Sequence, residues 1–368
     1  MIISKKQIRI GFIGIVAIFL LNAGLGLFLT HFNLVKKWYI FPNLHVEWEL
    51  EDVNNVPYSP DGPFVFFEKG LCLVKSIVVL DSIYIVKTDS VQIKENSEIL
   101  FAGNIHPGGI KTKIQSNFSN PGWEYAVPEK IFVVSDIEGQ FDALWQLLME
   151  VNVIDTAFNW TFGKNSLVIN GDLVDRGPQV TECLWLVYKL WKQAPEFGGK
   201  VHYILGNHEI MLLQSDTRYV NEKYLANSRI LKLEYEDLFN NSSVWGRWFR
   251  TRNAVEKIGP YIFVHGGIPP VLKDYKVSIP EMNLFVNGIL NDENWEESIR
   301  ENPKAKIFIQ NRPYWFRDYA QGEIQQESCD SVLQYYLGKS MIIGHTVVDN
   351  IQWMYNGKII AVDVDHAE

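Results

Sequence analysis

Five apolar runs after residue 130 each end in a group of polar residues. The polar motifs are VSDIEG, NGDLVDRG, LGNHEI, VHGGI and IGHTV. Longer segments with helical patterning separate most of the runs, which is typical of βαβ units. In open α/β sheets, ligands bind beyond the carboxyl ends of the strands. The sequence therefore predicts an α/β domain in which these motifs converge on one site.

The apolar runs and the segments between them give the expected elements of this domain, which we place at residues 128–368. Strands are expected at 131–135, 166–170, 201–205, 260–264, 340–343 and 358–362. Helices are expected at 141–151, 179–193, 208–215 and 220–239, with another near 243–252. Before this domain, residues 61–127 contain short β-branched and aromatic runs separated by Gly, Asp and Ser, which predict a small β-rich accessory region.

The N-terminal part of the chain has the pattern of a membrane anchor. After a tail at 1–9 that carries Lys5, Lys6 and Arg9, residues 10–30 are uncharged and mostly apolar. About 20 such residues match a transmembrane helix, and a cleaved signal peptide is the alternative. The cationic tail favours an N-terminus inside the cell and a catalytic domain outside the cytoplasm, in the periplasm. Residues 31–60 then serve as a linker.

Charge and cysteine content narrow the functional classes. The net charge is −9, with 43 acidic and 34 basic residues, so the chain lacks the basic character of a nucleic-acid-binding protein. A phosphorylated substrate is compatible with this net charge, because bound metal ions reverse the charge around the site. Three widely spaced cysteines, Cys72, Cys183 and Cys329, predict neither a disulfide framework nor a zinc site.

The polar motifs supply the ligands of a two-metal centre. They contain the carboxylates of Asp136, Glu138 and Asp172, the amide of Asn207, and the imidazoles of His265 and His345. Divalent ions about 3.5–4 Å apart share a carboxylate in such centres. Mixed oxygen and nitrogen ligands suit manganese, iron or zinc. One such motif would be weak support, but five at successive strand ends predict a metal site.

These motifs resemble those of the phosphoprotein-phosphatase branch of the calcineurin-like metallophosphoesterases. GDLVDRG, GNHE and HGGI are specific to that pattern, and the resemblance extends from residue 131 to about 363. The segment NRPYWFRDY before IIGHT, and the helical insertion between GNHE and HGG, are similar to the Shewanella-like bacterial phosphatases. The resemblance implies a four-layer fold, in which a β-sandwich of two mixed sheets is flanked by helices and holds the metal ions at one end.

The resemblance also implies a role for each motif residue. Asp136 would bind the first metal, Asp172 would bridge both metals, and Asn207, His265 and His345 would bind the second. A hydroxide bridging the metals would attack phosphorus directly, with His208 as general acid. The remaining positions would support this chemistry, with Asp175 orienting His208 while Arg176 and Arg317 bind phosphate oxygens.

Glu138 departs from the family pattern, which has histidine at this position. A glutamate can still bind a metal through oxygen, and its charge should favour Mn²⁺ or Mg²⁺ at the first site. Alternatively, the change to glutamate weakens metal binding at the first site. We therefore expect two divalent ions, primarily Mn²⁺, with Fe, Zn or Mg as alternatives.

Three functions fit these motifs. The first is a membrane-anchored, metal-dependent phosphatase that acts on phosphoserine, phosphothreonine or phosphotyrosine in proteins. The second is a hydrolase of dinucleoside polyphosphates or small phosphate esters, which shares the motifs and differs in its substrate groove. The third is a non-catalytic phosphate-binding protein, which the intact pair of Asp175 and His208 argues against.

Overall fold

The chain divides into two compact units, Met1–Pro57 and Tyr58–Glu368. The structure, a computed structural model, describes residues 37–41, 44–47, 58–81, 83–92, 99–102, 109–292, 294–299 and 301–365. In the first unit, strands β1 (Lys37–Phe41) and β2 (Leu44–Glu47) pair in antiparallel fashion within the segment predicted as a linker. The predicted membrane segment 10–30 lies outside the described residues. Among the helices that are described, none has the length and apolar character needed to span a bilayer.

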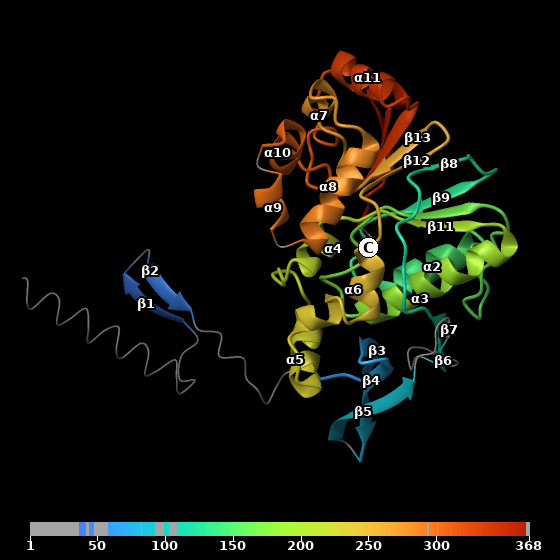
Figure 1. The fold of residues 1–368 in the computed structure, drawn as a ribbon, viewed down its shortest axis with the longest axis vertical. Coiled ribbons are helices and arrows are strands. Elements are labelled where there is room, and N and C mark those ends of the chain that lie inside the picture. Colours follow the sequence, from blue (N-terminus) through green and yellow to red (C-terminus); the bar gives the residue numbers. More distant parts are fainter. Residues whose placement is uncertain are drawn as a thin grey trace, which may run out of the picture. The chain divides into compact units, whose positions relative to one another are not determined.

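The second unit begins with the predicted β-rich region. An antiparallel sheet has the order β3 (Asp61–Glu68), β4 (Leu71–Leu80), β5 (Ile83–Gln92), and a separate pair joins β6 (Ile99–Ala102) to β7 (Lys111–Ile114). Strand β3 is almost wholly buried and its aromatic side chains join the main hydrophobic core. This region is therefore packed into the same compact unit as the motifs that follow it (Figure 1).

Two further sheets carry the polar motifs. The first has the order β11 (Lys200–Tyr203), β10 (Ser166–Ile169), β9 (Ile131–Val134), and all its strands are parallel. The second has the order β15 (Gln352–Met354), β16 (Ile359–Ala361), β14 (Ser340–Ile343), β13 (Tyr261–Val264), β12 (Val255–Ile258), β8 (Glu124–Tyr125), and it is mixed. The expectation of two mixed sheets was therefore wrong for the three-stranded sheet.

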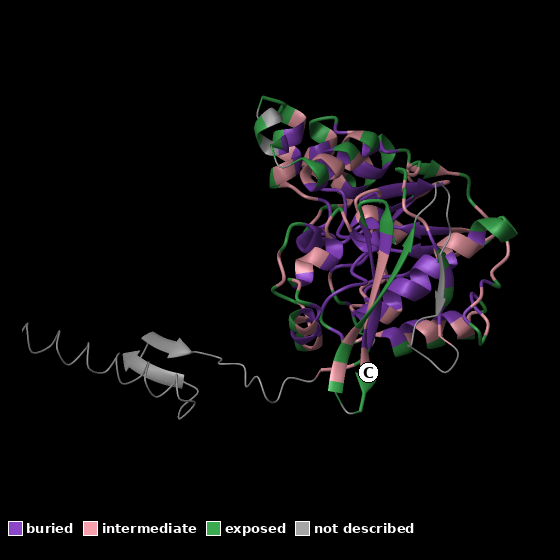
Figure 2. Ribbon diagram, turned by 60° about the horizontal axis from the view of Figure 1, so that its bottom comes forward, coloured by how far each residue is buried: buried purple, intermediate pink, exposed green. Residues whose placement is uncertain are grey.

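Alternation of side chains along the strands divides the interior into two apolar layers. Val168 of β10, Phe263 of β13 and Ile342 of β14 belong to a cluster between the two sheets. Their neighbours in sequence, such as Leu167 and Ile343, belong to the larger cluster that the helices cover. Successive residues of a strand face opposite sides, so each sheet has one face on the other sheet and one on helices. This is the predicted four-layer sandwich, and Figure 2 shows its buried centre.

The helices fall into two groups along the chain. The first group comprises α2 (Phe141–Glu150), α3 (Val180–Gln193), η1 (Ala194–Phe197), α4 (Asn207–Leu213), α5 (Glu222–Leu231), η2 (Tyr235–Phe239) and α6 (Val244–Phe249). The second comprises α7 (Pro270–Asp274), α8 (Ile279–Asn291), α9 (Trp295–Ser298), α10 (Pro303–Gln310) and α11 (Gln326–Tyr335), followed by η3 (Tyr355–Gly357). Figure 1 shows α7–α11 gathered on one side of the unit, beside β12 and β13.

All six expected strands are present, with ends that differ by a residue or two. The expected helix 220–239 was wrong in its extent. It is divided into α5 and η2 because Lys232 takes a left-handed conformation with φ of 55° and ends α5. Cys72, Cys183 and Cys329 are free and buried. His202 is a buried strand residue whose Nδ1 lies 2.6 Å from Glu256 Oε2, so it has a structural role.

Candidate metal centre

Residues of four of the five polar motifs line one pocket at the carboxyl ends of the strands, and His265 of the fifth motif lies 2.9 Å from Asp172 of that lining. The pocket has a volume of about 360 Å³ and is lined by Asp136, Ile137, Glu138, Gln140, Asp172, Arg176, His208, Arg317, His345, Val347, Asp363, Val364 and Asp365. Five carboxylates in this set face two arginines. This excess of negative charge in a partly buried site is the environment in which divalent cations bind.

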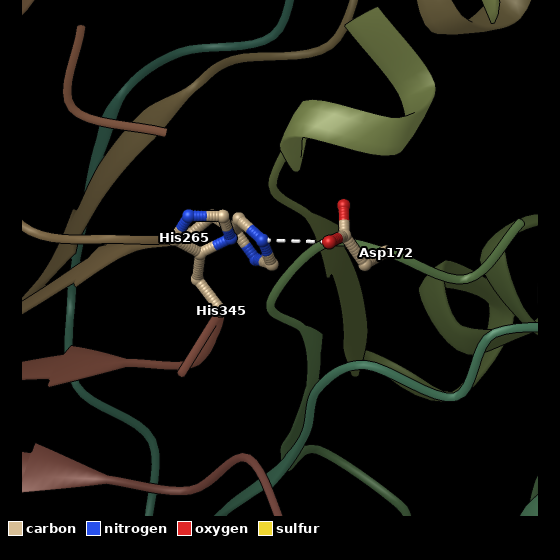
Figure 3. Close-up of side chains that lie close together, drawn as sticks. All are labelled: Asp172, His265 and His345. Atoms are coloured by element: carbon tan, nitrogen blue, oxygen red, sulfur yellow. Dashed lines mark ion pairs between the residues drawn. The ribbon is translucent and has the colours of Figure 1, made fainter. Parts of the chain in front are cut away.

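One side of the site joins Asp172, His265 and His345 (Figure 3). Nε2 of His265 lies 2.9 Å from Asp172 Oδ2 and 3.1 Å from Asn207 Oδ1. Nδ1 of the same ring lies 2.8 Å from the Asn170 carbonyl, which accepts its proton and leaves Nε2 directed at the oxygen ligands. The rings of His265 and His345 are 5.0 Å apart. These side chains present oxygen and nitrogen atoms that could hold one metal ion.

The other side joins Glu138, Asp172 and His208. Nε2 of His208 lies 3.8 Å from Asp172 Oδ2 and 3.9 Å from Glu138 Oε1. Asp136 stands next to the first group, because its Oδ1 is 3.9 Å from His265 Nε2. In each group, one potential ligand atom per residue lies within 4.8 Å of the others. Asp172 belongs to both groups, which is the position a bridging carboxylate occupies.

His345 carries an unsatisfied atom that fits a metal ligand. Its Nε2 is buried and has no hydrogen-bond partner among the described residues. Its main-chain N–H donates to Asp136 Oδ1 and Oδ2, at 3.2 and 3.0 Å, and this fixes the loop. A buried imidazole nitrogen without a partner costs free energy, whereas a divalent cation would satisfy it. The donor set therefore fits divalent metal ions.

His208 is arranged to hold a proton. Its Nδ1 lies 2.7 Å from Asp175 Oδ2, and both side chains are buried. Burial lowers the pKa of His208, but the hydrogen bond to Asp175 and the nearby charge of Asp172 outweigh this, so the pKa is raised above its ordinary value. Because Asp175 occupies Nδ1, the proton available for transfer is on Nε2, which faces the carboxylates of the site.

Two arginines line the same pocket. Arg176 forms an ion pair with Glu138, and half of its side chain is exposed. Arg317 reaches the site from the loop before α11 and donates from Nη1 to the main-chain oxygen of His345 and, at 3.2 Å, to Thr346 Oγ1. Guanidinium groups bind phosphate oxygens in bidentate fashion. The predicted phosphate-binding roles of both residues stay predictions.

The loops of the site are held in conformations that few residues adopt. Six site residues have positive φ values: Asp136 (53°), Glu138 (46°), Asp172 (51°), Asp175 (70°), Arg176 (52°) and His345 (66°). Such strain persists where surrounding contacts fix the chain, often at functional sites. Gly206 allows one close approach, because a Cβ there would overlap the carboxylate of Asp172.

Glu209 supports the loops and does not face the pocket. Its carboxylate accepts hydrogen bonds from the main-chain N–H groups of Asp172, Leu173 and Gly206, at 2.8–2.9 Å. The hydroxyl of Tyr203 also donates to it, at 3.0 Å. This fully buried glutamate therefore fixes the main chain at Asp172.

Several supporting residues were absent from the sequence prediction. Ser135 donates from Oγ to Asp136 and, at 3.1 Å, to the Asn170 carbonyl. Asn170 in turn orients His265. Both residues directly follow an apolar strand and precede a predicted ligand. This position in the sequence could have identified them as supporting residues. Tyr219, whose ring contacts His208, had no comparable signal because it lies in the helical insertion.

Together, a shared carboxylate between two metal-ligand groups, a paired histidine and pocket arginines define a metal-dependent phosphoesterase site. The chain belongs to the calcineurin-like phosphoesterase family, whose pattern matches residues 129–349. Proteins of this family use a dimetal centre. The predicted family is therefore confirmed.

Relatives and solved structures place the chain near one group in this family. It is 26% identical over 288 residues to Shewanella-like protein phosphatase 2 of Arabidopsis thaliana, covering 64% of this chain and 71% of the relative. It is 32% identical over 142 residues to a symmetrical bis(5'-nucleosyl)-tetraphosphatase of Methylococcus capsulatus, covering 38% and 44%. The cold-active protein-tyrosine phosphatase of a psychrophilic Shewanella species has a similar structure, with a TM-score of 0.73, 29% identity, and coverage of 83% and 90%.

The structural match extends beyond the motif-bearing domain. The match covers 83% of the chain, which is a larger share than residues 128–368 make up. It therefore includes residues that precede this domain. The match to the tetraphosphatase covers less than half of either chain. The similarity to the Shewanella phosphatase therefore covers more of the fold.

The carboxylate of Glu138 forms an ion pair with Arg176 in the structure. A metal-binding test of Glu138 is therefore informative, because it separates a metal ligand from a residue that only positions Arg176. If Glu138 binds the first metal, Glu138→Ala should reduce the content from two ions to about one and remove most hydrolysis. Glu138→His, which restores the family's residue, should keep two ions and shift preference toward zinc or iron. Metal content per chain, measured by mass spectrometry of the dialysed protein, checks this. A Glu138→Ala protein that keeps two ions but has a higher KM for phosphate esters would instead limit Glu138 to positioning Arg176.

Proposed function

We propose that this protein is a metal-dependent protein phosphatase that hydrolyses phosphoserine, phosphothreonine or phosphotyrosine. The observation that carries the proposal is the position of Asp172 in both metal-ligand groups, within 3.8 Å of the Nε2 atom of a paired histidine. The extended similarity to a Shewanella-like protein phosphatase and to a protein-tyrosine phosphatase supports the protein substrate.

The proposed metal ligands are Asp136, Glu138 and Asp172 for one ion, and Asp172, Asn207, His265 and His345 for the other. We expect both cations to be Mn²⁺. When bound, two divalent cations would lower the pKa of water and neutralise negative charge on the phosphate. The identity of the ions is part of the proposal, and the predominance of carboxylates around Asp136 and Glu138 favours Mn²⁺ over softer metals.

The protein's own residues complete the reaction. Arg176 and Arg317 bind the phosphate oxygens and orient the ester. The oxygen of a water molecule forms a bond to phosphorus while the bond from phosphorus to the ester oxygen breaks. His208, as the imidazolium, gives its Nε2 proton to that departing oxygen and becomes neutral, while Asp175 accepts the hydrogen bond from Nδ1 and stabilises the protonated ring before the transfer. The products are inorganic phosphate and the free hydroxyl of the amino acid.

A substrate panel tests this function. The full chain should release phosphate from phosphopeptides with Mn²⁺ and lose this activity in excess chelator, and readdition of Mn²⁺ should restore it. Cleavage of diadenosine tetraphosphate without cleavage of any phosphopeptide would favour the dinucleotide hydrolase instead. An absence of turnover with every divalent ion and every substrate would favour a phosphate-binding protein.

We also propose that residues 10–30 anchor the protein in the membrane, with the catalytic unit outside the cytoplasm. The uncharged run and its preceding cationic tail support this. In bacterial cells that produce the full chain, alkaline carbonate should leave the protein in the membrane pellet, and protease added to spheroplasts should digest the catalytic unit. Release by carbonate, or resistance to that protease, would contradict the proposal.

A further inference from the structure

An exposed aromatic ring lies beside the proposed proton donor. The ring of Tyr219 has its centroid 5.0 Å from that of His208, with the planes inclined by 57°. The guanidinium carbon of Arg176 lies 5.6 Å from the same centroid. Tyr219 nevertheless keeps 42% of its surface exposed. The guanidinium carbon of Arg218 lies 5.9 Å from the centroid as well. The ring thus contacts the donor and two arginines while keeping part of its area free for a ligand.

The main chain holds Tyr219 in this position. The N–H of Arg176 donates to the Tyr219 carbonyl at 2.9 Å, and Asn221 Nδ2 donates to the Arg176 carbonyl at 2.8 Å. A turn closed by the bond from Val220 N–H to the Thr217 carbonyl, at 3.1 Å, precedes α5. Because the segment is hydrogen-bonded directly to the arginine loop, the main chain at Tyr219 is held in place without substrate, which reduces the entropy cost of a contact.

The site's geometry locates the departing group relative to Tyr219. Asp175 occupies Nδ1 of His208, so the departing oxygen must lie within hydrogen-bond reach of Nε2, about 2.6–3.2 Å. In phosphotyrosine that oxygen is bonded directly to an aromatic ring. The substrate ring must therefore lie within a ring's width of His208, where Tyr219 also lies. In phosphoserine the same oxygen carries a CH₂ group, which offers no aromatic face.

We propose that Tyr219 forms the subsite for the departing side chain and is a specificity-determining residue that favours phosphotyrosine over phosphoserine. This proposal rests on the proposed phosphatase function. A favourable contact between the two rings forms only when the substrate side chain is aromatic. It therefore raises kcat/KM for phosphotyrosine and does not raise kcat/KM for phosphoserine.

The test uses two peptides that differ only in carrying phosphotyrosine or phosphoserine at the same position. For each protein variant, the measured quantity is the ratio of the two kcat/KM values, in which differences in folding or metal content cancel. An aromatic pair accounts for about a 2- to 13-fold change. Tyr219→Ala should therefore lower the phosphotyrosine to phosphoserine ratio by about that factor, and Tyr219→Phe should keep the wild-type ratio.

Trp315 provides a matched control on the other side of the site. It is also exposed, by 38%, and its ring lies edge-on to His345 at 5.5 Å. Because it contacts a proposed metal ligand and not the proton donor, Trp315→Ala should change both substrates by the same factor.

Separate outcomes identify which proposal fails. An unchanged ratio in Tyr219→Ala would overturn the subsite, as would a Tyr219→Phe ratio that falls as far as that of Tyr219→Ala. Both results assume that the wild-type chain hydrolyses the two peptides. If the wild-type chain hydrolyses neither peptide with any divalent ion, the phosphatase function itself is wrong, and the subsite is wrong with it.

Discussion

Asp172→Asn should reduce phosphoester hydrolysis by on the order of 10³-fold or more, because bound metal ions supply several kcal/mol of transition-state stabilisation. Asp172 is 1% exposed and belongs to both metal-ligand groups. An amide has nearly the same shape but lacks the charge needed to bridge two cations. The content of the dialysed protein should therefore fall below two ions per chain.

Asp349→Asn is the matched control for this substitution. Asp349 is an exposed carboxylate that follows the His345 loop without lining the pocket, so its amide variant should keep both ions and the wild-type rate. Wild-type metal content in Asp172→Asn would contradict a bridging role. A folded protein that binds metal normally and still hydrolyses phosphopeptides at the wild-type rate would remove Asp172 from the site altogether.

His208→Gln should produce a loss that depends on the departing group. A phosphoserine peptide releases a poor leaving group that needs a proton, so its kcat should fall by about 10²–10⁴-fold. The rate for p-nitrophenyl phosphate should fall much less, because nitrophenolate leaves without a proton. The Nδ1 bond to Asp175, 2.7 Å long, and the raised pKa of His208 both fit a group that holds this proton.

Metal analysis of the same variant separates two roles for His208, since its Nε2 also lies among the potential ligands around Glu138 and Asp172. A proton donor can be removed without loss of metal, so His208→Gln should keep two ions per chain. Equal losses for both phosphoesters, together with a missing ion, would make His208 a metal ligand and leave the proton donor unassigned.

The sequence was most informative where an apolar strand meets a polar turn. Strand β9 ends at Val134, two residues before Asp136, and β14 ends at Ile343, two residues before His345. Each strand therefore fixes the location of the functional side chain that follows it. Parallel pairing of β9 with β10, and of β13 with β14, then brings motifs far apart in sequence to the same end of the sandwich. Local patterning was sufficient for this part of the fold because ligands occur at strand ends for topological reasons.

Helices α7–α11 were not predicted, although one carried a clear signal. Ser278 accepts the N–H of Glu281, whose carboxylate accepts the N–H of Ser278, and this capping box begins α8. The residues Ser278-Ile-Pro-Glu281 therefore marked a helix start. Helices α7 and α9 contain five and four residues, too few to show a helical period. Tertiary packing, which sequence patterning does not reveal, stabilises such short helices.

The residues behind and beside the site could not be assigned from patterning alone. Glu209 supports the loops of the site by accepting hydrogen bonds from three main-chain N–H groups. The contact of Tyr219 with His208 depends on how the insertion after α4 folds back toward His208. Nothing in the residues around Tyr219 specifies that path, so this contact required the three-dimensional structure.

Anomalous X-ray diffraction from crystals of the full chain grown with Mn²⁺ tests the central claim most directly. Two strong anomalous peaks should flank the carboxylate of Asp172. One should lie near Asp136 and Glu138, and the other near Asn207, His265 and His345. Peaks located elsewhere, or no peak in this pocket at saturating Mn²⁺, would contradict the assignment of these strand-end residues to a shared metal centre.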